Sequence, residues 1–191
     1  SLHERLITKM FNLVKNGGLA LVCSLFIDFI SHYMPKELKS LYQKGAIPIH
    51  ILILIIFIVF VVVRGKEISR LTNFKKGIVI SLIFSTGISI YFYSYFKWIN
   101  PTYLIEKKEA LMALTDEDEL LLLAEEKIKN DSEYYHGKSA QDLVDMQQVN
   151  IEEMYKPGKI VPLYLMIFTI SGMLFSLIIS SLHFYYLKRV T

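Results

Sequence analysis

Four long apolar runs constrain this chain more than any other feature. They cover residues 17–34, 47–63, 77–99 and 160–187. Each run is long enough to cross a bilayer core of about 30 Å as a helix, although the second is close to the lower limit. None shows the polar stripe of a soluble helix. We therefore expect an all-α integral membrane protein with four transmembrane helices rather than a large soluble helical core.

The composition agrees with that class. Hydrophobic residues make up 53% of the 191 residues and charged residues 20%, against about 45–50% and about 25% in soluble domains. The one cysteine, Cys23, lies in the first run, where it is expected to pack as a small hydrophobic residue. One cysteine and five scattered histidines do not make a metal cluster, so we expect neither a metal nor a cofactor.

The distribution of lysine and arginine predicts the topology, because basic residues concentrate on the cytoplasmic side. Only three basic residues, Lys36, Lys39 and Lys44, lie in the short loop 35–46 between the first and second spans, against ten in the segments on the other side. Both termini should therefore be cytoplasmic, and residues 100–159 extracytoplasmic. Ten basic residues precede the first span, join the second to the third, or follow the fourth: Arg5, Lys9, Lys15, Arg64, Lys66, Arg70, Lys75, Lys76, Lys188 and Arg189.

Residues 1–16 precede the first three spans, which lie within residues 17–99. Apolar residues recur at helical spacing in this segment, with Arg5 and Lys9 between them. The segment is expected to be an interfacial amphipathic helix or a downward extension of the first span, with the interfacial helix slightly favoured. No small-residue cleavage motif follows the first run, so we expect it to be retained rather than removed as a signal peptide.

Residues 100–159 form an acidic segment before the fourth span and short tail at 160–191. They hold 14 acidic and 7 basic residues, a net charge of −7 within a chain of net charge +3. Two capping patterns predict a helical insertion. Leu120 to Leu123 are too apolar for a solvated helix, so they should pack on another helix, the membrane or a protein. The capping patterns are Thr115 with Asp118, and Ser139 with Asp142.

Small residues recur every four positions in the third and fourth spans. This spacing places them on one helix face, where they allow close backbone approach and hydrogen bonds between helices. We expect the two spans to pack through these faces; the alternatives are chance spacing and a face that receives a partner's helix. The residues are Gly77, Ser81, Ser85 and Ser89 in the third span and Gly172, Ser176 and Ser180 in the fourth.

Asp28 is an ionisable residue inside the first span. Such residues are costly in a membrane and usually face protein or water. One interpretation is a proton or ion path; the other is a neutral or hydrogen-bonded Asp28 near the interface, with His32 one turn away. The second is favoured, since the second and third spans show no matching partner. His50 and His183 are expected to be interfacial.

Aromatic residues crowd the end of the third span. Rings with polar tips suit the headgroup region, so we expect an interface belt. Pro101 disfavours a helical conformation at Asn100, and the span should therefore end or kink there. The belt residues are Tyr91, Tyr93, Tyr95 and Trp98.

No arrangement typical of catalysis occurs in the sequence. It has no glycine-rich phosphate loop, no H-E-x-x-H motif and no serine nucleophile elbow. The acidic run 116–119 lacks the alternating ligands of a calcium-binding loop. Basic residues lie at the membrane edges, where topology explains them without nucleic acid. We expect no enzyme, no catalytic residues and no nucleic-acid partner.

Several short motifs carry a family resemblance. The third span starts with Phe74, Lys75 and Gly77 and ends at Asn100-Pro101, before an acidic helical insertion. A Gly17-Gly18 pair and the late run SGMLFSLIISSL also fit. With these features residues 13–190 resemble a bacterial (Bacteroidota-type) family of small four-span inner-membrane proteins classed as a domain of unknown function. The resemblance implies an inner-membrane location and a link to a polyprenyl-phosphate glycosyltransferase.

These observations lead to three functional hypotheses. The leading one is a non-enzymatic accessory or structural subunit of a larger bacterial inner-membrane complex, which docks through its membrane helices and acidic helical loop. The first alternative is a small transporter or channel subunit with Asp28 in the path. The second is a membrane helper or anchor of a lipid-linked glycosyltransferase. The expected partners are the lipid bilayer and other inner-membrane subunits.

Overall fold

The computed structural model describes residues 2–65, 69–113 and 116–190; Lys66 and Thr115, used in the predictions above, lie outside them. The described residues form helices and short connections only. The helices are α1 (Leu2–His32), α2 (Lys36–Arg64), α3 (Arg70–Ser94) with the π-helical turn η1 (Tyr95–Ile99), α4 (Thr102–Ala113), α5 (Glu117–Asn130), α6 (Ala140–Met154) and α7 (Pro157–Val190).

The chain divides into two compact units, which are described separately. The first, Ser1–Tyr91 with Leu163–Thr191, is called the membrane unit, and the second, Phe92–Pro162, the insertion unit. Four helices are long and apolar enough to cross a membrane, which confirms the predicted multi-pass, all-helical class. Their apolar spans are Ile7–His32, Gly45–Arg64, Arg70–Ile99 and Pro157–Arg189.

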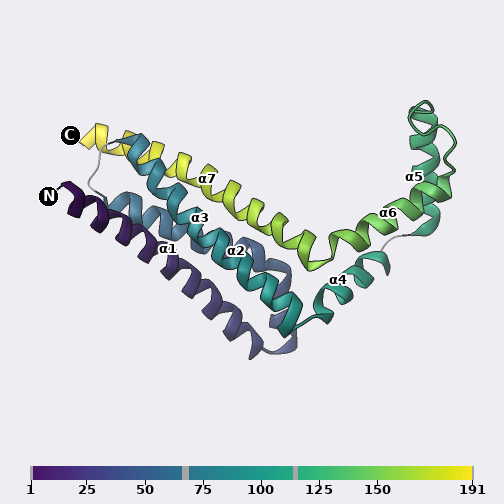
Figure 1. The fold of residues 1–191 in the computed structure, drawn as a ribbon, viewed down its shortest axis with the longest axis horizontal. Helices are drawn as coiled ribbons and strands as arrows, with labels where there is room; N and C mark the ends of the chain where they lie inside the picture. Colours follow the sequence, from purple (N-terminus) through teal and green to yellow (C-terminus); the bar gives the residue numbers. More distant parts are fainter. Residues whose placement is uncertain (1, 66–68, 114–115, 191) are drawn as a thin grey trace. The chain divides into compact units, whose positions relative to one another are not determined.

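The helices of the membrane unit run alongside one another, and both ends of the chain lie at the same end of this bundle (Figure 1). Helix α1 is continuous from Leu2 to His32. No break therefore separates residues 2–16 from the first span, so this segment extends the span, which is the second of the two alternatives.

The second helix differs from the sequence-based expectation. Helix α2 begins at Lys36, so residues 36–46 are helical and not a loop. Pro35 lies just before the helix, where its missing N–H removes no helical hydrogen bond. Pro48 lies inside α2 and is tolerated, as prolines often are in membrane helices.

Helices α3 and α7 meet through the predicted small residues. A Cβ atom added to Gly77 would lie 2.6 Å from Cβ of Ser176, and one added to Gly172 would collide with Ser81. The Ser81 and Ser176 hydroxyls donate to carbonyls of their own helices. Across the seam, Thr169 Oγ1 donates to Ser85 Oγ at 3.0 Å. Close backbone approach, more than bonding between helices, therefore characterises this contact.

Two further close approaches join α1 to α3. Gly17 lies against Ile83, and Leu21 packs over Gly87. Helix α3 consequently has glycine contacts on two sides, and its buried residues include Gly77, Ser85 and Ser89. The step-of-four pattern marked only the α7 side, because the α1 contact combines a glycine on one helix with a branched side chain on the other.

The insertion unit begins at the end of the third span. The helix stops at Ile99, and Asn100 leaves helical geometry with φ −140° and ψ 73°, which confirms the predicted stop. Phe96 is buried and stacks on both Phe92 and Tyr103, with ring centroids 5.7 Å apart in each pair. This aromatic stack lies where the third span ends, and its phenylalanines were not among the predicted belt residues.

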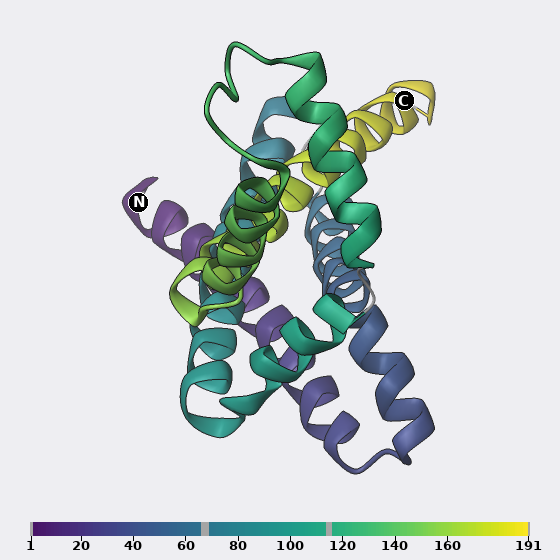
Figure 2. The same ribbon diagram turned by 90° about the vertical axis from the view of Figure 1, so that its right-hand side faces the viewer.

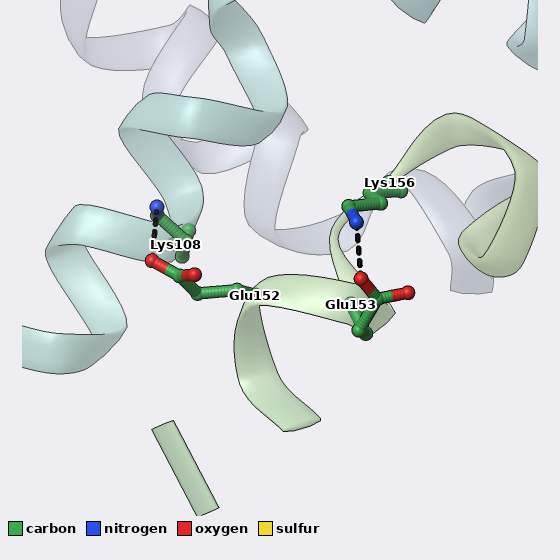
Figure 3. Close-up of polar contacts among 4 residues, drawn as sticks. All are labelled: Lys108, Glu152, Glu153 and Lys156. Atoms are coloured by element: carbon green, nitrogen blue, oxygen red, sulfur yellow. Dashed lines mark hydrogen bonds and ion pairs between the residues drawn. The ribbon is translucent and has the colours of Figure 1, made fainter. Parts of the chain in front are cut away.

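Helices α5 and α6 pack together in the insertion unit (Figure 2). Ala124 of α5 and Val144 of α6 are buried. Asp116 caps α5 by accepting from the Asp118 N–H. A capping box opens α6 at Ser139 and Asp142, as the sequence predicted. Ion pairs join Lys108 to Glu152 (3.3 Å) and Lys156 to Glu153 (Figure 3).

The α6 capping box should be sensitive to acid. Ser139 donates through its hydroxyl and its N–H to Asp142 Oδ2, each at 2.7 Å, and these bonds lower the pKa of Asp142 below its ordinary 3.8. A carboxylate with a lowered folded pKa stabilises the fold above its unfolded pKa and loses that effect as the pH falls through the folded value. The first turn of α6 should therefore fray in acid below about pH 4.

A carboxyl ¹³C titration by NMR checks this. Ser139→Ala should raise the pKa of Asp142 toward its ordinary value, whereas Ser139→Thr keeps the hydroxyl and should leave the pKa low. An unchanged titration in Ser139→Ala would contradict the prediction.

Candidate functional site

One face of α1 is built from small and polar residues. They recur at steps of three and four, which places them on one side of a helix, and all are buried. The opposite side carries large exposed apolar residues such as Phe26 and Phe29. Asp28 is thus turned into the bundle and away from the bilayer. The buried face comprises Gly17, Ala20, Ser24, Asp28 and Ser31.

Helix α2 supplies two side chains to Asp28. The Tyr42 hydroxyl donates a hydrogen bond to Asp28 Oδ1. Nε2 of His50 lies 3.4 Å from the same oxygen. His50 is fully buried and Asp28 is only 8% exposed. We call Asp28, Tyr42 and His50 the buried polar cluster.

Aromatic rings close the cluster on the side of α3 and α7. Phe168 meets His50 edge-on, with ring centroids 6.2 Å apart, and meets Phe84 in the same way at 5.8 Å. Both phenylalanines are fully buried. The imidazole therefore lies between a carboxylate and an apolar wall, where charges interact more strongly than in water.

Two oxygens on α1 are buried in this region and have no hydrogen-bond partner among the described residues. They are Asp28 Oδ2 and Ser24 Oγ, which belong to residues one helical turn apart. Ser31 Oγ, by contrast, donates to the Asp28 carbonyl at 2.6 Å. A buried polar atom without a partner is costly. Oδ2 is therefore an acceptor where a proton or a small polar species would gain a favourable contact.

Tyr42 stays a hydrogen-bond donor. It lies just before the span Gly45–Arg64. Burial, followed by the hydrogen bond and charge of Asp28 and the nearby Tyr91, raises the pKa of Tyr42. The phenol accordingly keeps its proton over the physiological pH range and donates it in the hydrogen bond to Oδ1 of Asp28.

The cluster differs from what the sequence suggested. His32 is exposed, while His50, expected at the interface, is buried against Asp28; His183 is half-buried. One signal was present: Asp28 and Tyr42 are each seven residues from Pro35, as expected for partners in a helical hairpin. That signal was missed because residues 36–46 were taken as a loop.

The other predicted residues lie outside this cluster. The small residues of α3 and α7 are all buried: Gly77, Ser81, Ser85, Ser89, Gly172, Ser176 and Ser180. Contacts between the two helices join Gly77 to Ser176, Ser81 to Gly172, and Ser85 to Thr169. Of the belt, Tyr91 is a half-buried residue of the membrane unit. In the insertion unit Tyr93 and Tyr95 are half-buried, Trp98 is exposed, and Lys97 Nζ lies 3.1 Å from the Tyr93 hydroxyl.

Comparison with known proteins identifies a family. The model of the family described as "Protein of unknown function (DUF4199)" matches residues 15–183. This covers most of the chain and confirms the resemblance to a domain of unknown function. No curated protein and no solved structure matches the chain.

Proposed function

Since the chain belongs to the DUF4199 family of proteins of unknown function, we propose a function from its own buried residues: it is a subunit of a proton-linked transporter or channel, with Asp28 in the path. The observation that carries this proposal is the contact of Asp28 with His50 at membrane depth. An ionisable residue in a membrane span with a named ionisable partner is a functional-site hypothesis by default.

The Asp28 contacts change the ranking of the hypotheses. The sequence favours an accessory role because it has no arrangement typical of catalysis and its loop has apolar surface to cover, and it shows no partner for Asp28 in the second and third spans. His50 now supplies an ionisable imidazole within 3.4 Å of the carboxylate. A purely structural pair remains a competing explanation, because replacing a buried ion pair with apolar residues is often neutral. Function and stability therefore need separate tests.

Proton exchange in the buried polar cluster requires only the rotation of a side chain. Tyr42 holds Asp28 Oδ1, so that a proton entering the bundle binds at Oδ2, which accepts no bond from the described residues. His50 Nε2 lies near enough to Oδ1 to receive or return a proton after a side-chain rotation. Each transfer changes the charge of a buried group, which is the coupling that a transport cycle needs.

The proposal includes a topology. The start of α1, the end of α2, the start of α3 and the end of α7 carry basic residues, and these four helix ends lie together at the end of the bundle that holds both chain termini (Figure 1). This supports an inner-membrane protein with cytoplasmic termini. On this topology residues 100–159 are extracytoplasmic. Asp28 then lies nearer the extracytoplasmic side, because it is four residues before the end of α1 at His32.

Asp28→Asn should abolish proton movement without unfolding the protein. The amide keeps the size of the side chain and an oxygen for Tyr42, but it does not exchange a proton. In proteoliposomes with an entrapped pH dye and an imposed potassium diffusion potential, the variant should fall to the rate of protein-free vesicles. Wild-type protein should exceed that rate.

Gly18→Ala is the matched control, because a Cβ at Gly18 meets nothing within 4 Å. It should transport like the wild type. The proposal is contradicted if Asp28→Asn matches the wild type, or if the wild type moves no protons at either sign of the potential.

The insertion unit favours a second candidate, an accessory subunit that docks on a partner. Leu122 and Val149 are 67% and 58% exposed although they lie outside the four spans. Exposed apolar residues of this kind often mark interaction surfaces. Wild-type vesicles without proton flux, together with a stoichiometric partner retained in mild detergent, would favour this candidate over the first.

A further inference from the structure

A second site lies at the opposite end of the membrane unit from Asp28. It is a cavity of about 700 Å³ between α1, α2 and α3. It lies at the end of the bundle where both ends of the chain lie (Figure 1). Four basic residues line it: Lys9 and Lys15 from α1, Arg64 from α2, and Lys76 from α3. Among the described residues that line this cavity, none is acidic.

These cations converge from three helices. An anion held among them would interact favourably with cations from all three helices. Topology alone does not require this arrangement, since basic residues orient a membrane protein wherever they lie on the cytoplasmic side. Lys75, next in sequence to Lys76, satisfies the same rule but does not line the cavity.

The polar groups at the cavity are held in place. Lys76 Nζ lies 3.5 Å from Oδ1 of the buried Asn73. It also packs against the end of α2, where a Cβ on Gly65 would come within 2.8 Å of it. The Arg64 guanidinium lies over the Phe60 ring, 5.3 Å from its centroid. Such stacking orients the planar donors of arginine, which match phosphate oxygens.

The cavity also has an apolar wall. Leu13, Phe60 and Val61 line it together with the cations. Phe60 and Val61 belong to the second span, and Leu13 to the first. A ligand that fits both parts carries a negative headgroup and an apolar continuation that can follow the helices into the bilayer.

We propose that this cavity binds the phosphate headgroup of an anionic phospholipid from the adjoining leaflet. The guanidinium of Arg64 and the ammonium groups of Lys9, Lys15 and Lys76 contact the phosphate. The Asn12 and Asn16 amides, which also line the cavity, contact the polar part of the headgroup. The apolar wall receives the start of an acyl chain. The site is independent of Asp28.

Native mass spectrometry of the full chain tests this proposal. The detergent-purified protein is offered equal amounts of phosphatidylglycerol and phosphatidylcholine, and retained lipid is counted. Wild-type protein should retain phosphatidylglycerol preferentially. Arg64→Gln and Lys76→Gln should each reduce that retention on the order of fivefold, the effect of about 1 kcal/mol per basic group near anionic lipid.

Lys75→Gln is the matched control, since it removes the same charge from the same helix outside the cavity. It should retain phosphatidylglycerol like the wild type. An equal loss in Lys75→Gln would overturn the proposal in favour of general surface attraction. Glycerol phosphate is added as a soluble competitor; if it displaces the lipid at equal concentration, the ligand is a soluble phosphate compound and the lipid assignment is wrong.

Discussion

Gly77→Ala should destabilise the membrane unit by about 2 kcal/mol, although it adds a single methyl group. The new Cβ would lie 2.6 Å from Cβ of Ser176 and closer still to its hydroxyl. Cβ of Ser176 is fixed to its backbone, so rotation of the serine side chain does not relieve the clash. Helices α3 and α7 have to separate, which loosens close-packed contacts along the seam.

Ser176→Gly provides a rescue, because it removes both atoms that the new methyl group meets. In that background Gly77→Ala should cost less than half as much. Gly18→Ala is again the control: it should be neutral or stabilise by up to about 1 kcal/mol through helix propensity. Unfolding in mixed micelles of mild detergent and dodecyl sulfate measures these differences. Equal costs for Gly77→Ala with and without Ser176→Gly would show that the α3–α7 contact is not the cause.

Removing one member of the buried polar cluster should cost about 3 kcal/mol in the same unfolding assay. Asp28→Ala leaves His50 and the Tyr42 hydroxyl in apolar surroundings without their carboxylate. His50→Leu approximates the imidazole in volume but removes the ring nitrogen that lies 3.4 Å from Asp28 Oδ1. Each single change therefore takes a polar neighbour away from a buried polar group, which costs free energy of folding.

The double variant Asp28→Ala/His50→Leu should be more stable than the sum of the single effects implies. An interaction free energy of about 1–3 kcal/mol is expected between residues in direct contact. Asp28→Ala combined with a distant change, Leu182→Ala on the exposed side of α7, serves as an additive reference. Strict additivity for Asp28 and His50 would show that their 3.4 Å contact does not contribute to folding.

The four spans and the end of the third could be predicted because their causes are local. Hydrophobic length decides whether a helix can cross a bilayer, and Pro101 acts on the residue directly before it. The capping box at Ser139 and Asp142 is likewise formed within four residues. None of these features depends on how the helices are arranged.

The Asp28 site could not be predicted to the same extent. Its partners lie 14 and 22 positions along the chain, and which helix faces meet depends on the start of α2 and on packing at Gly17 and Gly87. A helical segment mistaken for a loop was enough to hide Tyr42. His50 lies early in an apolar run, and its burial against Asp28 depends on how α1 and α2 pack.

The sequence by itself determined the membrane class, the four spans, the acidic helical insertion and the small faces of α3 and α7, since these follow from hydrophobic length, charge and the helical repeat. Only the tertiary structure decided that Asp28 meets Tyr42 and His50, and that Lys9, Lys15, Arg64 and Lys76 share one cavity. The physical reason is that side chains on different helices come together through register and crossing geometry, which packing sets across the whole bundle and which no local pattern encodes.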